Sequence, residues 1–342
     1  TTPARIPCSM ARNNHLLLLR FSALGDILMT VPVVDALARQ YPETTITVVS
    51  RAFVGSIFRR LPSNVQFIGV RLDNYPGVLG LSRLVKELCE KAQPTQVCDL
   101  HDVLRTKLMR PMFRLRGIPT CHIVKDRKAR KAFVRNRPLT QQETSFERYT
   151  KALERAGFPV KLDPSVRFCQ KPEKTESVKH TLRVGIAPFA AHATKIYPLD
   201  RMEQVVSLLN RRGAKVYLFG AGGGEEALTR VWASRYENVE SVVGTLPDMA
   251  AEMELMASLD VVLAMDSSNM HLAALTPTRL LSVWGATHPK GGFLPWGRDE
   301  SCCVQRDLDC RPCSIYGNKP CKFGDCRCMD IPVEEIVSKL CE

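Results

Sequence analysis

The 342-residue chain has no long hydrophobic run. Its purely apolar stretches are only a few residues long, whereas a membrane-spanning helix needs ~20. The apolar segment near the N-terminus is short, ends in Arg20 and lacks a cleavage-like site, so we expect no secretory signal. Hydrophobic residues make up 45% and charged residues 24% of the chain, which favours a soluble globular protein. A chain of this length is longer than a domain with a single hydrophobic core usually is, so we expect about two domains.

Acidic side chains are nearly missing from one segment. Between Arg105 and Arg137 there are 12 Lys or Arg residues and one acid, Asp126, so this segment carries +11 of the formal +13 net charge. A charge run is usually a solvated face. This one mixes its cations with apolar residues, namely Leu108, Met109, Met112, Phe113 and Phe133. The mixture favours an anionic amphiphile as partner, and since no RNA- or DNA-binding motif accompanies it, we expect no nucleic-acid partner.

A complete dinucleotide-binding fingerprint is also missing. In "YLFGAGGGEEAL", Gly220 and Gly222 match the first part of G-x-G-x-x-G, but Glu225 occupies the place of the third glycine. This disfavours a redox enzyme. Glu225 either belongs to a nucleotide-binding loop, or Glu225 or Glu226 only caps the following helix.

Strand-like and helix-like runs alternate along the chain in two series, which predicts parallel sheets built from βαβ units. The first series has strands at 15–20, 45–50, 66–70, 96–100 and 121–124, and closes with a helix near 145–156. The second has strands at 182–188, 214–220, 239–244, 260–266 and 279–285. The pattern predicts an α/β protein with two Rossmann-like domains facing an interdomain cleft.

The predicted boundaries follow from these two series. Residues 1–13 form a leader outside the fold, 14–165 the N-terminal domain, 166–181 a polar linker, and 182–329 the C-terminal domain with a cysteine-rich tail. The final helix, 330–342, has Asp330 as its expected N-cap and Pro332 in its first turn.

Asp26 lies where the first strand gives way to a helix. The strand ends at a short Ser-Ala-Leu-Gly loop, and apolar residues then recur at helical spacing from Ile27 to Ala38. Ligands of open parallel sheets bind beyond the carboxyl ends of the strands, where this loop lies. Asp26 is therefore a candidate active-site acid, although an Asp at a helix start also simply complements the helix dipole.

Four ordered motifs resemble glycosyltransferase family 9. They are "RFSALGDILMTVPVVDAL", "GIAPFAAHATKIYPLDRMEQVV", "DVVLAMDSSNMHLAAL" and "LLSVWGATHP". The resemblance implies a GT-B fold, a nucleotide-sugar donor in the C-terminal lobe, an acceptor in the N-terminal lobe, and inverting transfer without a required cofactor or metal. It implies heptose transfer, with ADP-heptose as the expected donor and the lipopolysaccharide inner core as acceptor. Another sugar or acceptor, or a catalytically silent glycolipid- or sugar-nucleotide-binding protein, are the alternatives.

The resemblance also implies residue roles on the donor side. Asp26 matches the catalytic base and Lys195 the lysine that binds the diphosphate, with Thr194 beside it. Ala190, Ala191 and His192 stand where family members carry hydroxyl residues. Asp266, Ser267 and Ser268 match a donor-binding motif, although Ser268 replaces a usual glycine. His271 is either a donor contact or a hydrogen-bonded core histidine.

On the acceptor side, we expect Ser22 and Gly25 beside Asp26, together with basic residues of the cationic segment: Arg105, Arg127, Lys128, Arg130 and Lys131. The implied acceptor is an anionic glycolipid, so we expect a cytoplasmic protein that is peripheral to the inner face of the cytoplasmic membrane.

Eight of the 13 cysteines lie after residue 300. "CRPC" and "CKFGDCRC" provide a C-x2-C and a C-x-C, a zinc-like grouping without a standard spacing. Reduced thiols are the first interpretation and disulfides the weakest. A structural zinc is the second, with the ligands Cys310, Cys313, Cys321 and Cys328.

Overall fold

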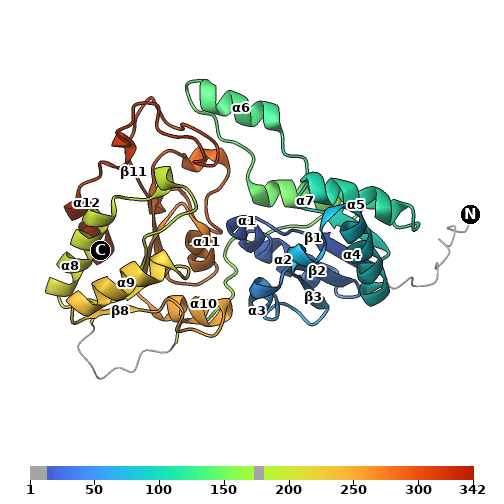
Figure 1. Cartoon of the computed structure of the whole chain (residues 1–342), viewed down its shortest axis with the longest axis horizontal. Coiled ribbons are helices and arrows are strands. Elements are labelled where there is room, and N and C mark those ends of the chain that lie inside the picture. Colours follow the sequence, from blue (N-terminus) through green and yellow to red (C-terminus); the bar gives the residue numbers. More distant parts are fainter. Residues whose placement is uncertain (1–13, 173–180) are drawn as a thin grey trace, which may run out of the picture. The chain divides into compact units, whose positions relative to one another are not determined.

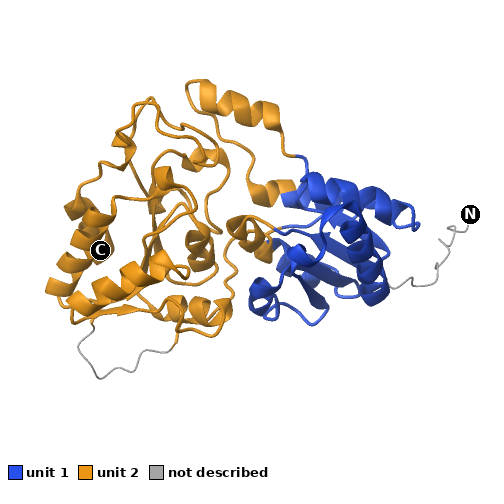
Figure 2. Cartoon of the chain, viewed as in Figure 1, with its two compact units in different colours: residues 1–21, 33–124, 149–161 blue, residues 22–32, 125–148, 162–342 orange. Residues whose placement is uncertain are grey.

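The computed structural model describes residues 14–172 and 181–342, so the expected leader and residues 173–180 of the expected linker lie outside the described residues. The chain separates into two compact units (Figures 1 and 2). Of the described residues, unit 1 comprises 14–21, 33–124 and 149–161, and unit 2 comprises 22–32, 125–148, 162–172 and 181–342. The expected N-terminal domain, 14–165, therefore gives two internal segments to unit 2.

Unit 1 is built on a five-stranded parallel sheet of order β3-β2-β1-β4-β5. Its central strand carries the apolar run Leu16 to Leu19, in which every side chain is at most 1% exposed, as expected for a strand covered on both faces. The strands are β1 (His15–Leu19), β2 (Thr45–Arg51), β3 (Val65–Val70), β4 (Gln96–Asp99) and β5 (Thr120–His122).

Unit 2 contains a six-stranded sheet of order β11-β10-β9-β6-β7-β8, again parallel throughout. Counted from β6, this is the 3-2-1-4-5-6 order of a doubly wound dinucleotide-binding sheet. Its strands are β6 (Arg183–Ala187), β7 (Lys215–Leu218), β8 (Val239–Ser241), β9 (Val261–Met265), β10 (Arg279–Trp284) and β11 (Cys303–Gln305). The predicted fold class, parallel α/β in two domains, is confirmed, although the three-residue β11 was not predicted.

Helices accompany both sheets (Figure 1). In the first half of the chain they are α1 (Leu24–Leu28), α2 (Val31–Gln40), α3 (Gly55–Phe58), α4 (Gly77–Ala92), α5 (Leu104–Arg114), α6 (Arg127–Arg135) and α7 (Ser145–Arg155). In the second half they are α8 (Leu199–Arg211), α9 (Gly224–Arg235), α10 (Met249–Ser258), α11 (Ser268–Ala274) and α12 (Val333–Cys341). Within the described residues, none of the helices has both the length and the apolar character needed to cross a membrane.

Two predicted helix details differ from the structure. The helix that carries Asp26 ends at Leu28 and a second one starts at Val31, because Pro32 has no N–H with which to continue the hydrogen-bond ladder. Asp330 as the N-cap of the last helix is wrong: α12 starts at Val333 with Pro332 at the N-cap. The Asp330 carboxylate instead forms an ion pair with Arg201 at 2.7 Å.

The described part of the expected linker is attached to unit 2. The indole N–H of Trp296 donates to the carbonyl of Val166 at 2.9 Å, and the N–H of Phe168 donates to the carbonyl of Leu275 at 2.8 Å. These bonds hold the start of the segment against the unit that contains the six-stranded sheet.

Candidate active site

The centre of the unit 2 sheet is a topological switch point. From β6 the chain moves outward through β7 and β8, whereas from β9 it moves the other way through β10 and β11. Loops that leave two such strands diverge at their carboxyl ends and open a crevice for a ligand. Lys195 ends a short 3-10 turn, Ala193–Lys195, in the loop after β6, and Asp266 directly follows β9.

Lys195 and Asp266 form a buried ion pair at this point. The Lys195 Nζ lies 2.9 Å from Asp266 Oδ2, and the two side chains are 15% and 7% exposed. The same carboxylate oxygen accepts a hydrogen bond from the Thr287 hydroxyl at 2.7 Å. An ammonium group has three N–H donors, so the lysine can bind Asp266 and an anionic ligand together.

Two buried polar groups follow Asp266 without a partner. Within the described residues, neither Ser267 Oγ nor His271 Nδ1 forms a hydrogen bond, although both atoms are shielded from solvent. Burial lowers the pKa of His271 to about 4, against the opposing charges of Asp266 and Asp26. The imidazole is therefore neutral at physiological pH. Buried polar groups are normally hydrogen-bonded, so these two atoms are candidates for hydrogen bonds with a bound ligand.

Asp26 joins this group because α1 packs against α11. A Cβ atom on Gly25 would lie 2.9 Å from His271 Cδ2 and 3.8 Å from the Cα of Ser268, so only glycine permits this close approach. Asp26 is the next residue, and its Oδ2 accepts from the backbone N–H of Ala23, the helix N-cap, at 3.3 Å. Ser22 immediately precedes this turn. Unit 2 thus brings the predicted base next to the predicted donor residues.

The remaining donor candidates have local partners. The Thr194 hydroxyl donates to the carbonyl of Gly317 at 2.6 Å, which ties the cysteine-rich tail to the turn that carries Lys195. Glu225 lies in the first turn of α9, and its Oε2 accepts a hydrogen bond from the N–H of Ala221 in the preceding glycine-rich loop at 2.7 Å. This bond ties the glycine-rich loop to the first turn of the helix, and the contact of Glu225 with a nucleotide stays a prediction.

Arg311 is a supporting residue that the sequence did not reveal. It is 2% exposed, and its guanidinium donates to the carbonyls of Gly285 and Thr287 at 2.5 and 2.8 Å and to Gln305 Oε1 at 3.0 Å. Because Thr287 in turn binds Asp266, Arg311 fixes the loop that orients the ion pair. The "CRPC" motif drew attention only to its cysteines, and an arginine in such a loop normally lies in solvent.

The tail cysteines are free thiols in the structure. In residues 14–172 and 181–342, no group of three or more His, Cys, Asp or Glu side chains is arranged to hold a metal ion. The zinc site at Cys310, Cys313, Cys321 and Cys328 stays a prediction.

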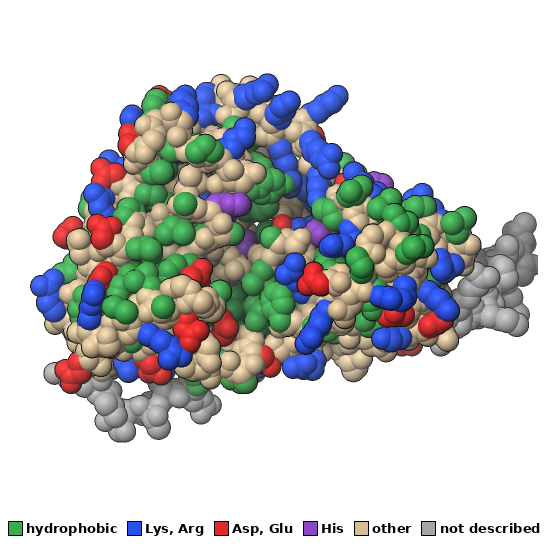
Figure 3. Space-filling model, viewed as in Figure 1, with side chains coloured by type: hydrophobic (Ala, Val, Ile, Leu, Met, Phe, Trp, Pro, Cys, Tyr) green, Lys and Arg blue, Asp and Glu red, His purple; other side chains and the backbone are tan. Residues whose placement is uncertain are grey.

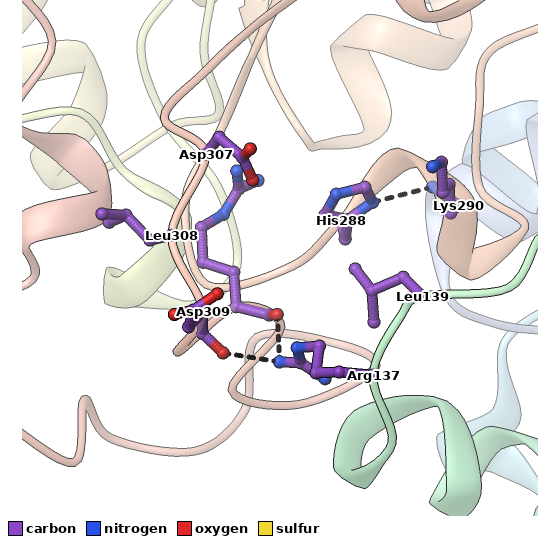
Figure 4. Close-up of a pocket in the computed structure, with 8 residues that line it drawn as sticks. Arg137, Leu139, His288, Lys290, Asp307, Leu308 and Asp309 are labelled. Carbon is purple, nitrogen blue, oxygen red and sulfur yellow. Dashed lines mark hydrogen bonds between the residues drawn. The ribbon is translucent and has the colours of Figure 1, made fainter.

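A cavity of about 180 Å³ lies beside the loop after β10 (Figure 4). Arg137 lines it and donates to the carbonyl of Asp309 at 2.9 Å, while the N–H of Lys290 donates to His288 Nδ1 at 3.1 Å. Burial lowers the pKa of His288 to about 4, and the nearby cations act in the same direction. Asp307 and Asp309 also line the cavity, so it has no strong preference for one sign of charge.

The cationic segment divides between the two units. Arg105 belongs to α5 in unit 1, and α6 in unit 2 exposes Arg127, Lys128 and Lys131. The Arg130 guanidinium instead lies over the rings of Phe293 and Tyr316, with its carbon 5.7 and 5.6 Å from their centroids.

Three of the apolar residues that suggested an amphiphile as partner of this segment are buried in the structure. Met109, Phe113 and Phe133 are at most 3% exposed. They belong to the core because they face inward from their helices.

Unit 1 holds a buried polar cluster that the sequence analysis missed. Asp99 is fully buried, and its Oδ1 accepts from the N–H groups of His101 and Asp102, both at 2.9 Å. Arg110 Nε lies 3.7 Å from Asp99 Oδ2. The cluster follows β4 at the switch point between β1 and β4, where ligands of such sheets bind. The sequence feature that could have revealed this cluster is an acid and a histidine, Asp99 and His101, at the end of the strand predicted over 96–100.

Comparisons with known proteins show the family and agree with the fold. The family model of glycosyltransferase family 9 (heptosyltransferase) matches residues 82–323, more than half of the chain. No curated protein matches.

Solved structures with the same fold include E. coli ADP-heptose lipopolysaccharide heptosyltransferase II, at 16% identity and TM-score 0.66, covering 95% of this chain and 97% of that one. E. coli heptosyltransferase WaaC with ADP has 16% identity, TM-score 0.62 and coverage of 85% and 92%. WaaC with ADP-2-deoxy-2-fluoro heptose has 15% identity, TM-score 0.63 and coverage of 95% and 99%. The protein belongs to glycosyltransferase family 9, the heptosyltransferase family, and is a glycosyltransferase enzyme.

Proposed function

We propose that this enzyme transfers a heptose from ADP-heptose to the lipopolysaccharide inner core, with inversion at the anomeric carbon. The observation that carries the proposal is the group formed by Asp26, Lys195, Asp266 and His271 at one end of the unit 2 sheet. It combines a carboxylate, a cation and a buried imidazole nitrogen that has no hydrogen-bond partner in the described part of the chain. The binding of ADP and an ADP-heptose analogue by WaaC supports an adenine nucleotide sugar as donor.

Each residue then has a defined part in the reaction. Asp26 takes the proton of an acceptor hydroxyl, whose oxygen attacks the anomeric carbon. The bond from that carbon to the diphosphate oxygen breaks, and ADP leaves with the bonding electron pair. Lys195 neutralises the charge that develops on the diphosphate, and Asp266 holds the ammonium group in place. His271 and Ser267 offer neutral hydrogen-bonding atoms to the donor. No resident cofactor is part of this proposal.

For the acceptor we propose an anionic glycolipid at the inner face of the cytoplasmic membrane. The support is the exposed row of cations on α6, namely Arg127, Lys128 and Lys131. Cations that are not buried in ion pairs attract phosphates and carboxylates at low ionic strength. Ser22 and Gly25 lie beside Asp26, so an acceptor hydroxyl would be held near them. For the tail we propose reduced thiols, with a structural zinc as the alternative.

The test measures transfer from a panel of nucleotide sugars, with Asp26→Asn and Asp200→Asn compared at matched thermal stability. Asp200 is a suitable control because it is also an acid in the first turn of a helix, α8, and is exposed. We expect Asp26→Asn to lose ~100- to 10,000-fold in turnover, with donor affinity unchanged or slightly tighter because a nearby negative charge is removed. Asp200→Asn should behave as wild type.

Two results would contradict the proposal. Turnover of Asp26→Asn within a few-fold of wild type would place the base elsewhere. Efficient transfer from a different nucleotide sugar, with none from ADP-heptose, would show that ADP-heptose is not the donor.

A further inference from the structure

Helix α5 has two apolar faces, although only one is needed for the core of unit 1. Met109 and Phe113 are fully buried and pack in that core. Leu104, the first residue of the helix, and Leu115, which follows its last residue and keeps helical backbone angles, are instead 75% and 87% exposed. They are separated by eleven positions, about three helical turns, so they lie on the same side of the helix, opposite the buried residues. Pro111, between them on that side, is also exposed.

Cations border this outward face on both sides. Residues 104–116 contain five Lys or Arg and no Asp or Glu. At 100° per residue, Lys107 and Arg114 fall on one flank of the Leu104–Leu115 line, and Arg105 and Arg116 on the other. All four cations are exposed. An apolar stripe between two basic flanks is the pattern of a helix that lies in a membrane interface.

The neighbouring helix extends the apolar character. Helix α4 packs against α5 and opens with Val78 and Leu79, which are 55% and 87% exposed. Apolar side chains reach the surface over this part of unit 1, with Lys and Arg side chains between them (Figure 3). A single exposed leucine is ordinary in a globular protein, but several beside a run of cations indicate an interaction surface.

We propose that the outward face of α5 docks on the surface of a bilayer that contains anionic phospholipids. Leu104 and Leu115 enter the boundary between headgroups and acyl chains, and the flanking cations contact lipid phosphates. This inference rests on the proposed function, because a lipid-linked acceptor requires the enzyme to work at a membrane. It assigns a task to leucines that the fold does not need and to cations that form no part of the donor site.

The test uses the full chain and sedimentation with vesicles of phosphatidylcholine, with or without phosphatidylglycerol. We expect binding only to the anionic vesicles. The double variant Leu104→Ser/Leu115→Ser should lower the partition coefficient by about 10-fold or more. The triple variant Lys107→Gln/Arg114→Gln/Arg116→Gln should lower it by at least as much and remove most of its salt dependence. Val231→Ser, which alters an exposed apolar residue of α9, should bind as wild type.

A second measurement separates this inference from the proposed function. The leucine variant should retain wild-type turnover with a lipid-free acceptor saccharide and lose activity only with acceptor embedded in vesicles. In Leu115→Trp, the emission should shift to the blue on anionic vesicles. Equal vesicle binding of wild type and the leucine variant would overturn the inference. So would tight binding of a nucleic-acid oligonucleotide that the leucine changes do not affect and that vesicles do not displace, because the face would then serve a different polyanion.

Discussion

Removing the Lys195 ammonium should damage stability and nucleotide binding by two separable routes. The Asp266 side chain is 7% exposed, and in Lys195→Met it would keep, among the described residues, the hydrogen bond from the Thr287 hydroxyl but not its cation. Breaking a buried pair by removing one partner typically costs ~3 to 5 kcal/mol of unfolding free energy. The missing charge-assisted hydrogen bond to a diphosphate should weaken ADP binding by ~1.5 to 3 kcal/mol, roughly 10- to 150-fold in Kd.

The double variant Lys195→Met/Asp266→Asn distinguishes the routes. An amide at position 266 carries no charge and still accepts from Thr287, so most of the lost stability should return. ADP affinity should stay low, because the cation is still missing. Lys215→Met is the matched control: Lys215 also pairs with a carboxylate, that of Glu240 at 3.4 Å, but the side chains are 36% and 53% exposed. Such exposed pairs contribute ~0 to 1 kcal/mol.

Urea denaturation and calorimetric titration with ADP supply both quantities. A single variant as stable as wild type would refute the burial argument for the pair. If the double variant also regained ADP affinity, Lys195 would act only by compensating Asp266, and its assignment to the diphosphate would be wrong.

The remaining predictions concern three other features. Burial lowers the folded-state pKa of His271 from 6.5 to about 4. The neutral imidazole should therefore contribute about 3 kcal/mol to the free energy of unfolding above pH 6.5, and this contribution should be lost as the pH falls towards 4. His271→Gln should remove this part of the pH dependence of the unfolding free energy, and an unchanged dependence in the variant would contradict the prediction. Cys321, whose pKa is lowered by backbone hydrogen bonds, should be alkylated before Cys313 and Cys328, whose pKa values are raised by burial; uniform protection of all three, with about one zinc per chain by elemental analysis, would favour the metal. Replacing the exposed α6 cations Arg127, Lys128 and Lys131 by Gln should raise the acceptor KM and flatten its salt dependence without changing the donor KM. Equal salt dependence of the acceptor KM in variant and wild type would show that these cations do not bind the acceptor.

The sequence alone determined the strand framework and the residues at strand ends. Parallel strands that are covered on both faces are apolar along their whole length. The apolar runs Leu16 to Leu19 and Val261 to Met265 could therefore be recognised as strands. Since ligands bind beyond the carboxyl ends of such strands, Asp26 could be found from its position in the chain, whereas Lys195 and Asp266 were assigned through the resemblance of their motifs to the family. The break between α1 and α2 was harder to predict, because one proline decided it.

Only the tertiary structure decided which residues meet. Gly25 and His271 lie far apart in the sequence, and their contact depends on how α1 packs on α11. The role of Arg311 depends on backbone carbonyls of a distant loop, which no local pattern encodes. Met109 and Leu104 lie on different faces of α5, and helical spacing alone does not say which of the two faces the sheet covers. The physical reason is the same in each case: burial is set by the neighbouring element and not by the residue itself.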